Sequence, residues 1–146
     1  MKKSEENENK KEYLRKYQDS VKAMKRIEEY LHELELNEVC PSINLNGMPT
    51  ATTYNNKDLS DYAVKKDKLI SDLLRARYKR VCIYNDVLKY IETLEKEEEK
   101  DVLMYRYIKK MQWEDVAKKM NVEWAQVHRI HGRALRNLPI PPNCEQ

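Results

Sequence analysis

Apolar residues recur at helical spacing along two long stretches of the chain, and charged residues fill the positions between them. The first stretch covers about residues 12–36 and the second about residues 60–95, with steps of roughly 3.5 residues. In the first stretch the apolar positions are Tyr13, Tyr17, Val21, Met24, Ile27, Leu31 and Leu34. In the second stretch they are Ile70, Leu74, Val81, Tyr84, Leu88 and Ile91, widened by Leu73, Val87 and Leu94. This pattern predicts two long amphipathic helices, paired as an antiparallel hairpin. Residues 1–12 are polar, and we expect them to fray.

The segment 37–58 interrupts this pattern. Pro41, Gly47 and Pro49, with several Asn and Thr residues, prevent a regular helix. A loop of this length is either a plain connector or a function-bearing segment, and the connector is the favoured interpretation.

The C-terminal part of the sequence predicts three shorter helices. The first covers about residues 97–110 and begins with acidic residues, which suit a helix N-terminus. The stretch 111–138 then predicts two helices around Asn121, a residue that tolerates the left-handed conformation of a tight turn. The apolar positions are Val116, Ala117 and Met120 before the turn, and Val127, Ile130, Ala134 and Leu138 after it. This spacing predicts a helix-turn-helix; an ordinary helical hairpin is the alternative.

These elements together predict an all-α protein. Charged residues make up 36% of the chain, which contains only two Gly and no Phe, a composition typical of long helices. We expect a helical hairpin over 1–97, a helix-turn-helix domain over 98–139, and a Pro-rich tail over 140–146. The wide apolar stripe of the hairpin suits coiled-coil pairing, either within one chain or with a second copy in a homodimer or higher homo-oligomer.

The charge distribution points to a nucleic-acid partner. Residues 102–146 carry eight basic and four acidic groups, 8 − 4 = +4, whereas the rest of the chain sums to −1. A second basic cluster comprises Arg75, Arg77, Lys79 and Arg80. It could contact phosphates, but a solvated face neutralised by neighbouring Asp residues is the favoured interpretation.

A helical wheel of the last helix separates a buried side from an outward side. Ala125, Arg129, Gly132, Arg133 and Arg136 point outward, flanked by Gln126 and His128. In a helix-turn-helix this face enters the major groove.

The residue types on this face suggest separate roles. Gln126 can pair with adenine and Arg129 with guanine, whereas Arg133 and Arg136 suit phosphates. Lys118 and Lys119 of the preceding helix also suit phosphates. Gly132 would either allow a close approach of the backbone to DNA or have no role.

Other chemistry finds little support in the sequence. His128 and His131 have a spacing that could bind metal, but no Cys or acidic residue joins them, so we expect neither a metal nor a cofactor. The chain has no nucleophile motif and no Gly-rich phosphate loop, so we expect no enzyme. The acidic run Glu95–Glu99 is interpreted as solvated. Trp113 is expected in the core, and Trp124 as a wedge against the preceding helix.

Cysteine usage and hydropathy suggest a cytoplasmic protein. Cys40, Cys82 and Cys144 are odd in number and widely spaced, as expected of reduced thiols. The sequence shows neither a signal peptide nor an apolar run of membrane-spanning length.

The segment EKDVLMYRYIKKMQWEDVAKKMNVEWAQVHRIHGRALRNL resembles the fourth, DNA-binding region of bacterial sigma factors. With the loop PSINLNGMP and the segment DLSDY, the chain looks similar to small phage proteins of the ArpU-like and RinA-like families. The sequence departs from the sigma pattern at two places. Gln112 and Glu123 replace the Ser or Thr that would cap each helix. Trp124 and Ala125 stand where the sigma recognition helix carries Arg and Glu.

The resemblance implies a regulator of phage or prophage late transcription that binds double-stranded DNA in a bacterial cytoplasm and contacts host RNA polymerase. Two alternatives remain open. One is a small terminase subunit that recognises phage DNA for packaging. The other is an adaptor whose helix-turn-helix binds only protein.

Overall fold

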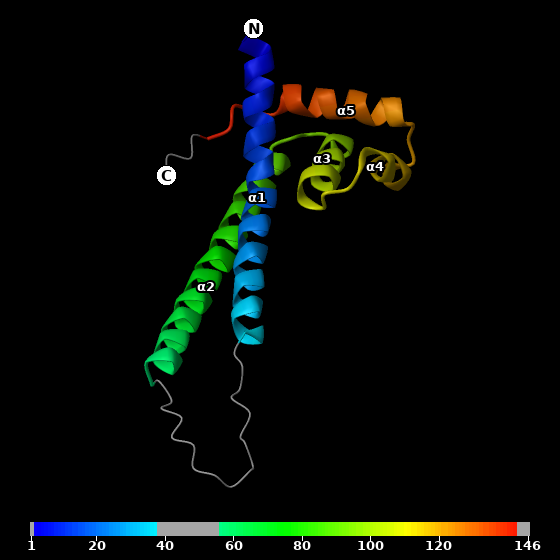
Figure 1. The fold of residues 1–146 in the computed structure, drawn as a ribbon. Coiled ribbons are helices and arrows are strands. Elements are labelled where there is room, and N and C mark those ends of the chain that lie inside the picture. Colours follow the sequence, from blue (N-terminus) through cyan, green and yellow to red (C-terminus); the bar gives the residue numbers. More distant parts are fainter. Residues whose placement is uncertain (1, 38–55, 143–146) are drawn as a thin grey trace. The chain divides into compact units, whose positions relative to one another are not determined.

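The computed structural model describes residues 2–37 and 56–142, and all regular elements in these ranges are helical (Figure 1). The elements are α1 (Lys2–Leu36), α2 (Asn56–Glu92), α3 (Glu97–Leu103), the π-helical turn η1 (Met104–Ile108), α4 (Trp113–Met120) and α5 (Trp124–Asn137). The predicted all-α class is therefore confirmed. Nearly all of the predicted loop 37–58, together with Cys40, Cys144 and the end of the tail, lies outside the described residues.

Packing divides the chain into two compact units. Unit 1 comprises Met1–Lys22 and Tyr78–Gln146, and unit 2 comprises Ala23–Arg77. The start of α1 and the end of α2 thus belong to the same unit as the C-terminal helices. The predicted division at residues 97 and 98 is a division by function and stays a prediction.

Within unit 2, α1 and α2 pair in antiparallel fashion. Glu35 contacts Lys66 at 3.2 Å and Glu28 contacts Arg77 at 3.2 Å, so the sequence positions run in opposite directions along the two helices. Arg75 also lies 3.8 Å from Asp72. The acidic partners of Arg75 and Arg77 agree with the favoured interpretation of the basic cluster as a neutralised, solvated face.

Within unit 1, the same two helices are antiparallel and form the main core. The ring of Tyr13 packs edge-on against Tyr90, and Tyr17 packs against Tyr84. The core continues into the C-terminal helices. Its buried members are Tyr13, Leu14, Val87, Tyr90, Ile91, Leu94, Leu103, Tyr107, Ala134, Leu135 and Leu138.

The first residues of α1 form a helix, contrary to the expectation that residues 1–12 fray. Lys10 is only 5% exposed, and its Nζ donates a hydrogen bond of 2.9 Å to the carbonyl oxygen of Leu135. That carbonyl belongs to the last turn of α5, whose final carbonyls have no partner within the helix and attract a cation. A contact with a distant part of the chain thus accompanies the longer helix.

The buried stripe of α2 also differs from the predicted one. Ile70, Leu74 and Val81 are exposed, whereas Leu73 and Val87, predicted only to widen the stripe, are buried. Two overlapping apolar stripes satisfy the same spacing, and the side that faces α1 determines which of them is covered.

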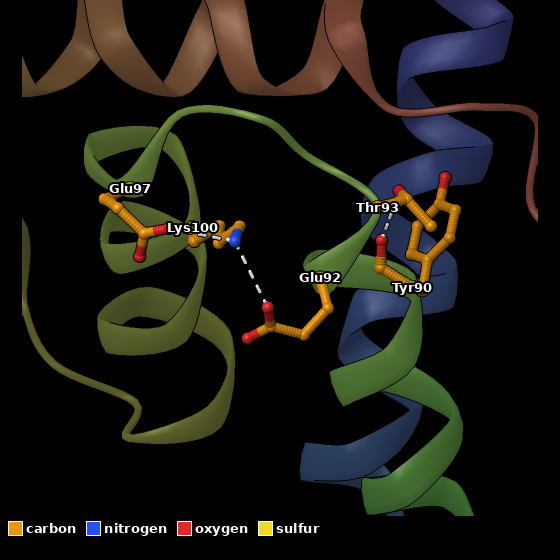
Figure 2. A network of polar contacts seen from close by, with 5 residues as sticks. All are labelled: Tyr90, Glu92, Thr93, Glu97 and Lys100. Atoms are coloured by element: carbon orange, nitrogen blue, oxygen red, sulfur yellow. Dashed lines mark hydrogen bonds and ion pairs between the residues drawn. The ribbon is translucent and has the colours of Figure 1, made fainter.

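The connection from α2 to α3 is held by polar contacts (Figure 2). The Thr93 hydroxyl donates to the carbonyl oxygen of Tyr90 at 2.7 Å, and Lys100 lies 3.2 Å from Glu92 and 2.9 Å from Glu97. The side-chain hydrogen bond to Glu97, together with that to Glu92, raises the pKa of Lys100.

Glu99 corrects the expectation of a fully solvated acidic run. It is 1% exposed, and both of its carboxylate oxygens accept hydrogen bonds from the Asn137 amide, at 3.1 and 2.9 Å. A buried carboxylate needs such donors. Glu99 therefore joins the start of α3 to the end of α5.

The helix predicted over about 97–110 is interrupted by η1. Its wider turn is marked by the hydrogen bond from the Lys109 N–H to the carbonyl oxygen of Met104, at 3.0 Å. The carbonyl oxygens of Arg106 and Tyr107 instead accept hydrogen bonds from the Gln18 amide, at 3.2 and 3.0 Å. Gln18 of α1 thus satisfies backbone groups that the irregular turn leaves without a helical partner.

Among the described residues, no helix combines the length and the apolar character needed to cross a membrane.

Candidate nucleic-acid interface

The helices α4 and α5 form the predicted helix-turn-helix, with residues 121–123 as the turn. Asn121 has φ 56° and ψ 44°, the left-handed conformation expected of it. Its N–H and that of Val122 donate to the final carbonyls of α4, with a distance of 3.1 Å from Val122 N to the oxygen of Ala117. This arrangement ends α4 sharply and redirects the chain into α5.

A small core holds the two helices against α3. Its buried residues are Val102, Val116, Ala117, Val127 and Ile130. Val116, Ala117, Val127 and Ile130 are therefore buried as predicted, whereas Met120 is only partly buried and the buried Leu135 was not predicted. The helix α5 lies beside both α3 and α4 (Figure 1).

Both helices begin without a side-chain cap, as the sequence predicted. Gln112 and Glu123 occupy the N-cap positions in extended conformation, and neither makes a capping hydrogen bond through its side chain. Each helix start therefore keeps N–H groups that a Ser or Thr would otherwise satisfy.

The outward face of α5 is positively charged. The helix has no acidic residue, and Ala125, Arg129 and Arg136 are exposed at the positions that the helical wheel assigned to solvent. Gln126 at the flank is half-buried. Lys118 and Lys119 are exposed in the last turn of α4.

Two of the predicted contact residues, Arg133 and Arg136, already make contacts within the protein. Arg133 is half-buried and lies 3.8 Å from Glu98 of α3, and its buried Nε has no hydrogen-bond partner among the described residues. Arg136 is exposed, and its Nε donates a hydrogen bond to the carbonyl oxygen of Gly132 at 3.3 Å. A phosphate contact by Arg133 would compete with Glu98, whereas Arg136 is available to solvent.

The backbone at Gly132 has open space around it. Apart from its chain neighbours and the backbone of its own helix, a methyl group added there would meet no described atom within 4 Å. No packing within the described residues therefore requires a glycine at this position.

Aromatic and imidazole rings cover the other flank of α5. The His128 ring lies between Trp124, at 4.2 Å between centroids, and Trp113, at 4.6 Å. Trp124 is 55% exposed, and its ring packs on His128 of its own helix; a wedge against α4 stays a prediction. Trp113 is half-buried, not fully in the core. The Nε2 of His128 is buried, so this edge of the ring faces away from solvent.

His131 lies deeper on the same flank. Its ring stacks on Tyr107, and its Nε2 lies 3.1 Å from the Tyr107 hydroxyl. Burial lowers the pKa of His131 to about 4, assisted by the nearby charges of Lys11, His128 and Arg106. His131 is therefore neutral at physiological pH and acts as a structural residue.

No family model, curated protein or solved structure matches this chain. The argument for function accordingly rests on the geometry and charge of the chain itself.

Sequence reasoning missed several residues that hold η1 and α5 in place. Lys10, Gln18 and Glu99 each make hydrogen bonds to residues far away in the sequence. Their only sequence signal is a polar residue within a region of helical pattern, which is equally typical of a solvated face.

Proposed function

We propose that the protein is a sequence-specific double-stranded DNA-binding protein that regulates transcription, in particular that of phage or prophage late genes in a bacterial cytoplasm. The observation that carries the proposal is the basic, acid-free face of α5, presented after a left-handed turn at Asn121. The exposed Arg129 and Arg136 on this face support the proposal, because a recognition helix carries basic and polar side chains on its outward side.

The mechanism places α5 in the major groove. Gln126 and Arg129 in its N-terminal half would contact base edges, each bidentate pair contributing about 1–3 kcal/mol of discrimination. Arg136, with Lys118 and Lys119 of α4, would bind phosphates and fix the orientation on the duplex. His128 has a smaller part in this mechanism than predicted, because its Nε2 is buried.

The experiment that tests the proposal begins with selection of bound duplexes from a random pool. The selected site is then titrated with Arg129→Ala, Arg136→Ala and the control Arg26→Ala, which removes an exposed arginine of α1 in unit 2. Arg129→Ala should weaken the selected site roughly fivefold to 150-fold, with little effect on random DNA. Arg136→Ala should weaken both and reduce the slope of log affinity against log salt by about 1.

Two results contradict DNA binding through α5. One is the absence of duplex binding at low salt. The other is a loss in Arg26→Ala equal to that in Arg129→Ala. A salt-independent interaction with protein partners would instead favour the adaptor.

The N-terminal helices are proposed to supply self-association or the contact with RNA polymerase. Large apolar side chains on α2 are exposed, among them Leu74 at 60%, and such surfaces often mark protein contacts. A packaging subunit is the alternative function that self-association favours. Mass measurement in solution separates the two: a monomer or dimer supports regulation, and a closed ring of roughly eight or more copies supports packaging.

A further inference from the structure

A cavity of about 420 Å³ lies within unit 1, beside α5 and the first residue of α4. Its walls come from α1, η1, the segment 109–112, α4 and α5. Four of its ten lining residues are basic, namely Lys11, Arg15, Arg106 and Lys110, and none is acidic. A cavity of this size is in the range of small-ligand sites. Its charge would attract an anion.

The cationic groups of this cavity approach from separate elements. Arg106 is held in place because its guanidinium donates to the carbonyl oxygen of Met111 at 2.9 Å and lies 4.6 Å from the centre of the Trp113 ring. Arg15 is exposed on α1, one turn from Lys11. Lys11 is partly neutralised by Glu8, at 2.6 Å. Arg15, Arg106 and Lys110 therefore provide most of the positive charge.

Lys110 has an unusual backbone conformation. Its φ is 54°, in the left-handed region, which costs a residue with a Cβ atom about 1–2 kcal/mol. Neither glycine nor asparagine stands here, although either would relieve that cost. Lys110 thus places its charge at the wall of the cavity from a strained backbone position.

His128 contributes part of its ring surface to the cavity wall. Its Nε2 is buried, and it has no hydrogen-bond partner among the described residues although the ring lines the cavity. This nitrogen is therefore not accessible to an anion in the cavity. Gln18, by contrast, is committed to the carbonyl oxygens of Arg106 and Tyr107 and so shapes the wall.

We propose that this cavity, with Arg15, Arg106 and Lys110 as its main cationic groups, binds a phosphate group. Guanidinium and ammonium groups that line one cavity from several elements suit the several acceptor oxygens and the double charge of phosphate better than a single carboxylate. The phosphate comes either from a free phosphorylated small molecule or from the DNA backbone beside the reading face. The site is distinct from that face, since His128 and His131 lie roughly a quarter turn or more around α5 from Arg129.

The test is a calorimetric titration of the full chain with inorganic phosphate and with pyrophosphate, at constant ionic strength adjusted with chloride. Arg15→Gln and Lys110→Asn should each weaken binding roughly threefold to tenfold. Arg26→Gln on α1 removes the same charge at a residue that does not line the cavity and should leave the affinity within about twofold. Lys110→Asn is informative because asparagine tolerates the left-handed conformation, so the variant keeps the fold while it loses the charge.

Absence of saturable binding of both anions overturns the proposal, and so does an equal loss in Arg26→Gln and in the two cavity variants. A repeat with DNA bound identifies the source of the phosphate. Competition between pyrophosphate and a random duplex supports a DNA phosphate in the cavity, whereas simultaneous binding supports a free ligand. Because the first titration contains no DNA, it succeeds or fails independently of the proposed recognition by α5.

Discussion

The imidazole of His131 should make the stability of unit 1 depend on pH. The ring is stacked on Tyr107 and edge-on to Trp113, with the charges of Lys11, Arg106 and His128 nearby. Burial is the largest cause of its lowered pKa, about 4 in the folded chain against 6.5 for a free histidine. Protonation would place a cation in a buried position that already has positive neighbours.

The sign of the effect follows from proton binding. Between pH 6.5 and 4 the unfolded chain holds the proton at His131 and the folded chain does not, so lowering the pH favours unfolding. The contribution of neutral His131 is fully present above pH 6.5 and is lost as the pH falls towards 4. The difference between the two pKa values corresponds to about 3 kcal/mol in the free energy of unfolding. That is a large share of the 5–15 kcal/mol typical of a domain.

The assay is urea unfolding at several pH values between 7 and 4 for the unmodified chain, His131→Gln and the control His32→Gln. His32 is exposed on α1 in unit 2. Carboxylates titrate in all three proteins, so the informative quantity is the difference between their pH profiles. Between pH 7 and pH 4, the free energy of unfolding of the unmodified chain and of His32→Gln should fall by about 3 kcal/mol more than that of His131→Gln. Parallel profiles for all three, or a His131 resonance that titrates near pH 6.5, would refute the reasoning.

Three further substitutions follow from individual contacts. Gly132→Ala should raise the free energy of unfolding by up to about 1 kcal/mol, because helix propensity improves and the methyl group meets no atom; lower stability in thermal unfolding would contradict this. Glu99→Ala should lower the free energy of unfolding in urea by about 1–3 kcal/mol, because it leaves the Asn137 amide without its acceptor. The control Glu98→Ala, at an exposed position, should change it by less than about 0.5 kcal/mol, and equal effects would refute the role of Glu99 in joining α3 to α5. Leu74→Glu should dissociate a self-associated chain in sedimentation without unfolding it, and a wild-type chain that is monomeric at all concentrations would exclude self-association through this face.

The helix-turn-helix was predictable because each of its features is local. The spacing of Val116, Val127 and Ile130 fixes which side of each helix is buried, and Asn121 supplies the left-handed turn at the expected place. Local spacing was also enough to predict the two long helices. It was insufficient for choosing between the overlapping stripes of α2, because Leu73 and Leu74 both satisfy the helical period and only packing distinguishes them.

The features that sequence reasoning missed depend on partners far away in the chain. Lys10 and Leu135 are 125 positions apart, and Glu99 and Asn137 are 38 positions apart. In the sequence, Lys10 and Glu99 both stand in highly charged segments, where a buried and a solvated charge look alike. The π-helical turn is similarly hidden, because its freed carbonyl oxygens are satisfied by Gln18 of another helix.

The position of α5 depends on residues on both sides of the predicted boundary between 97 and 98. Lys10 binds the end of α5, and Leu135 and Leu138 pack in one core with Leu14 and Ile91. A fragment of residues 98–139 would lose these contacts and expose part of the apolar face of α5. A loss of DNA binding on truncation of the N-terminal helices would therefore have two sources, a missing partner contact and a misplaced recognition helix. Substitutions on exposed positions of α1 and α2 separate them, because they remove partner contacts and leave the core of α5 intact.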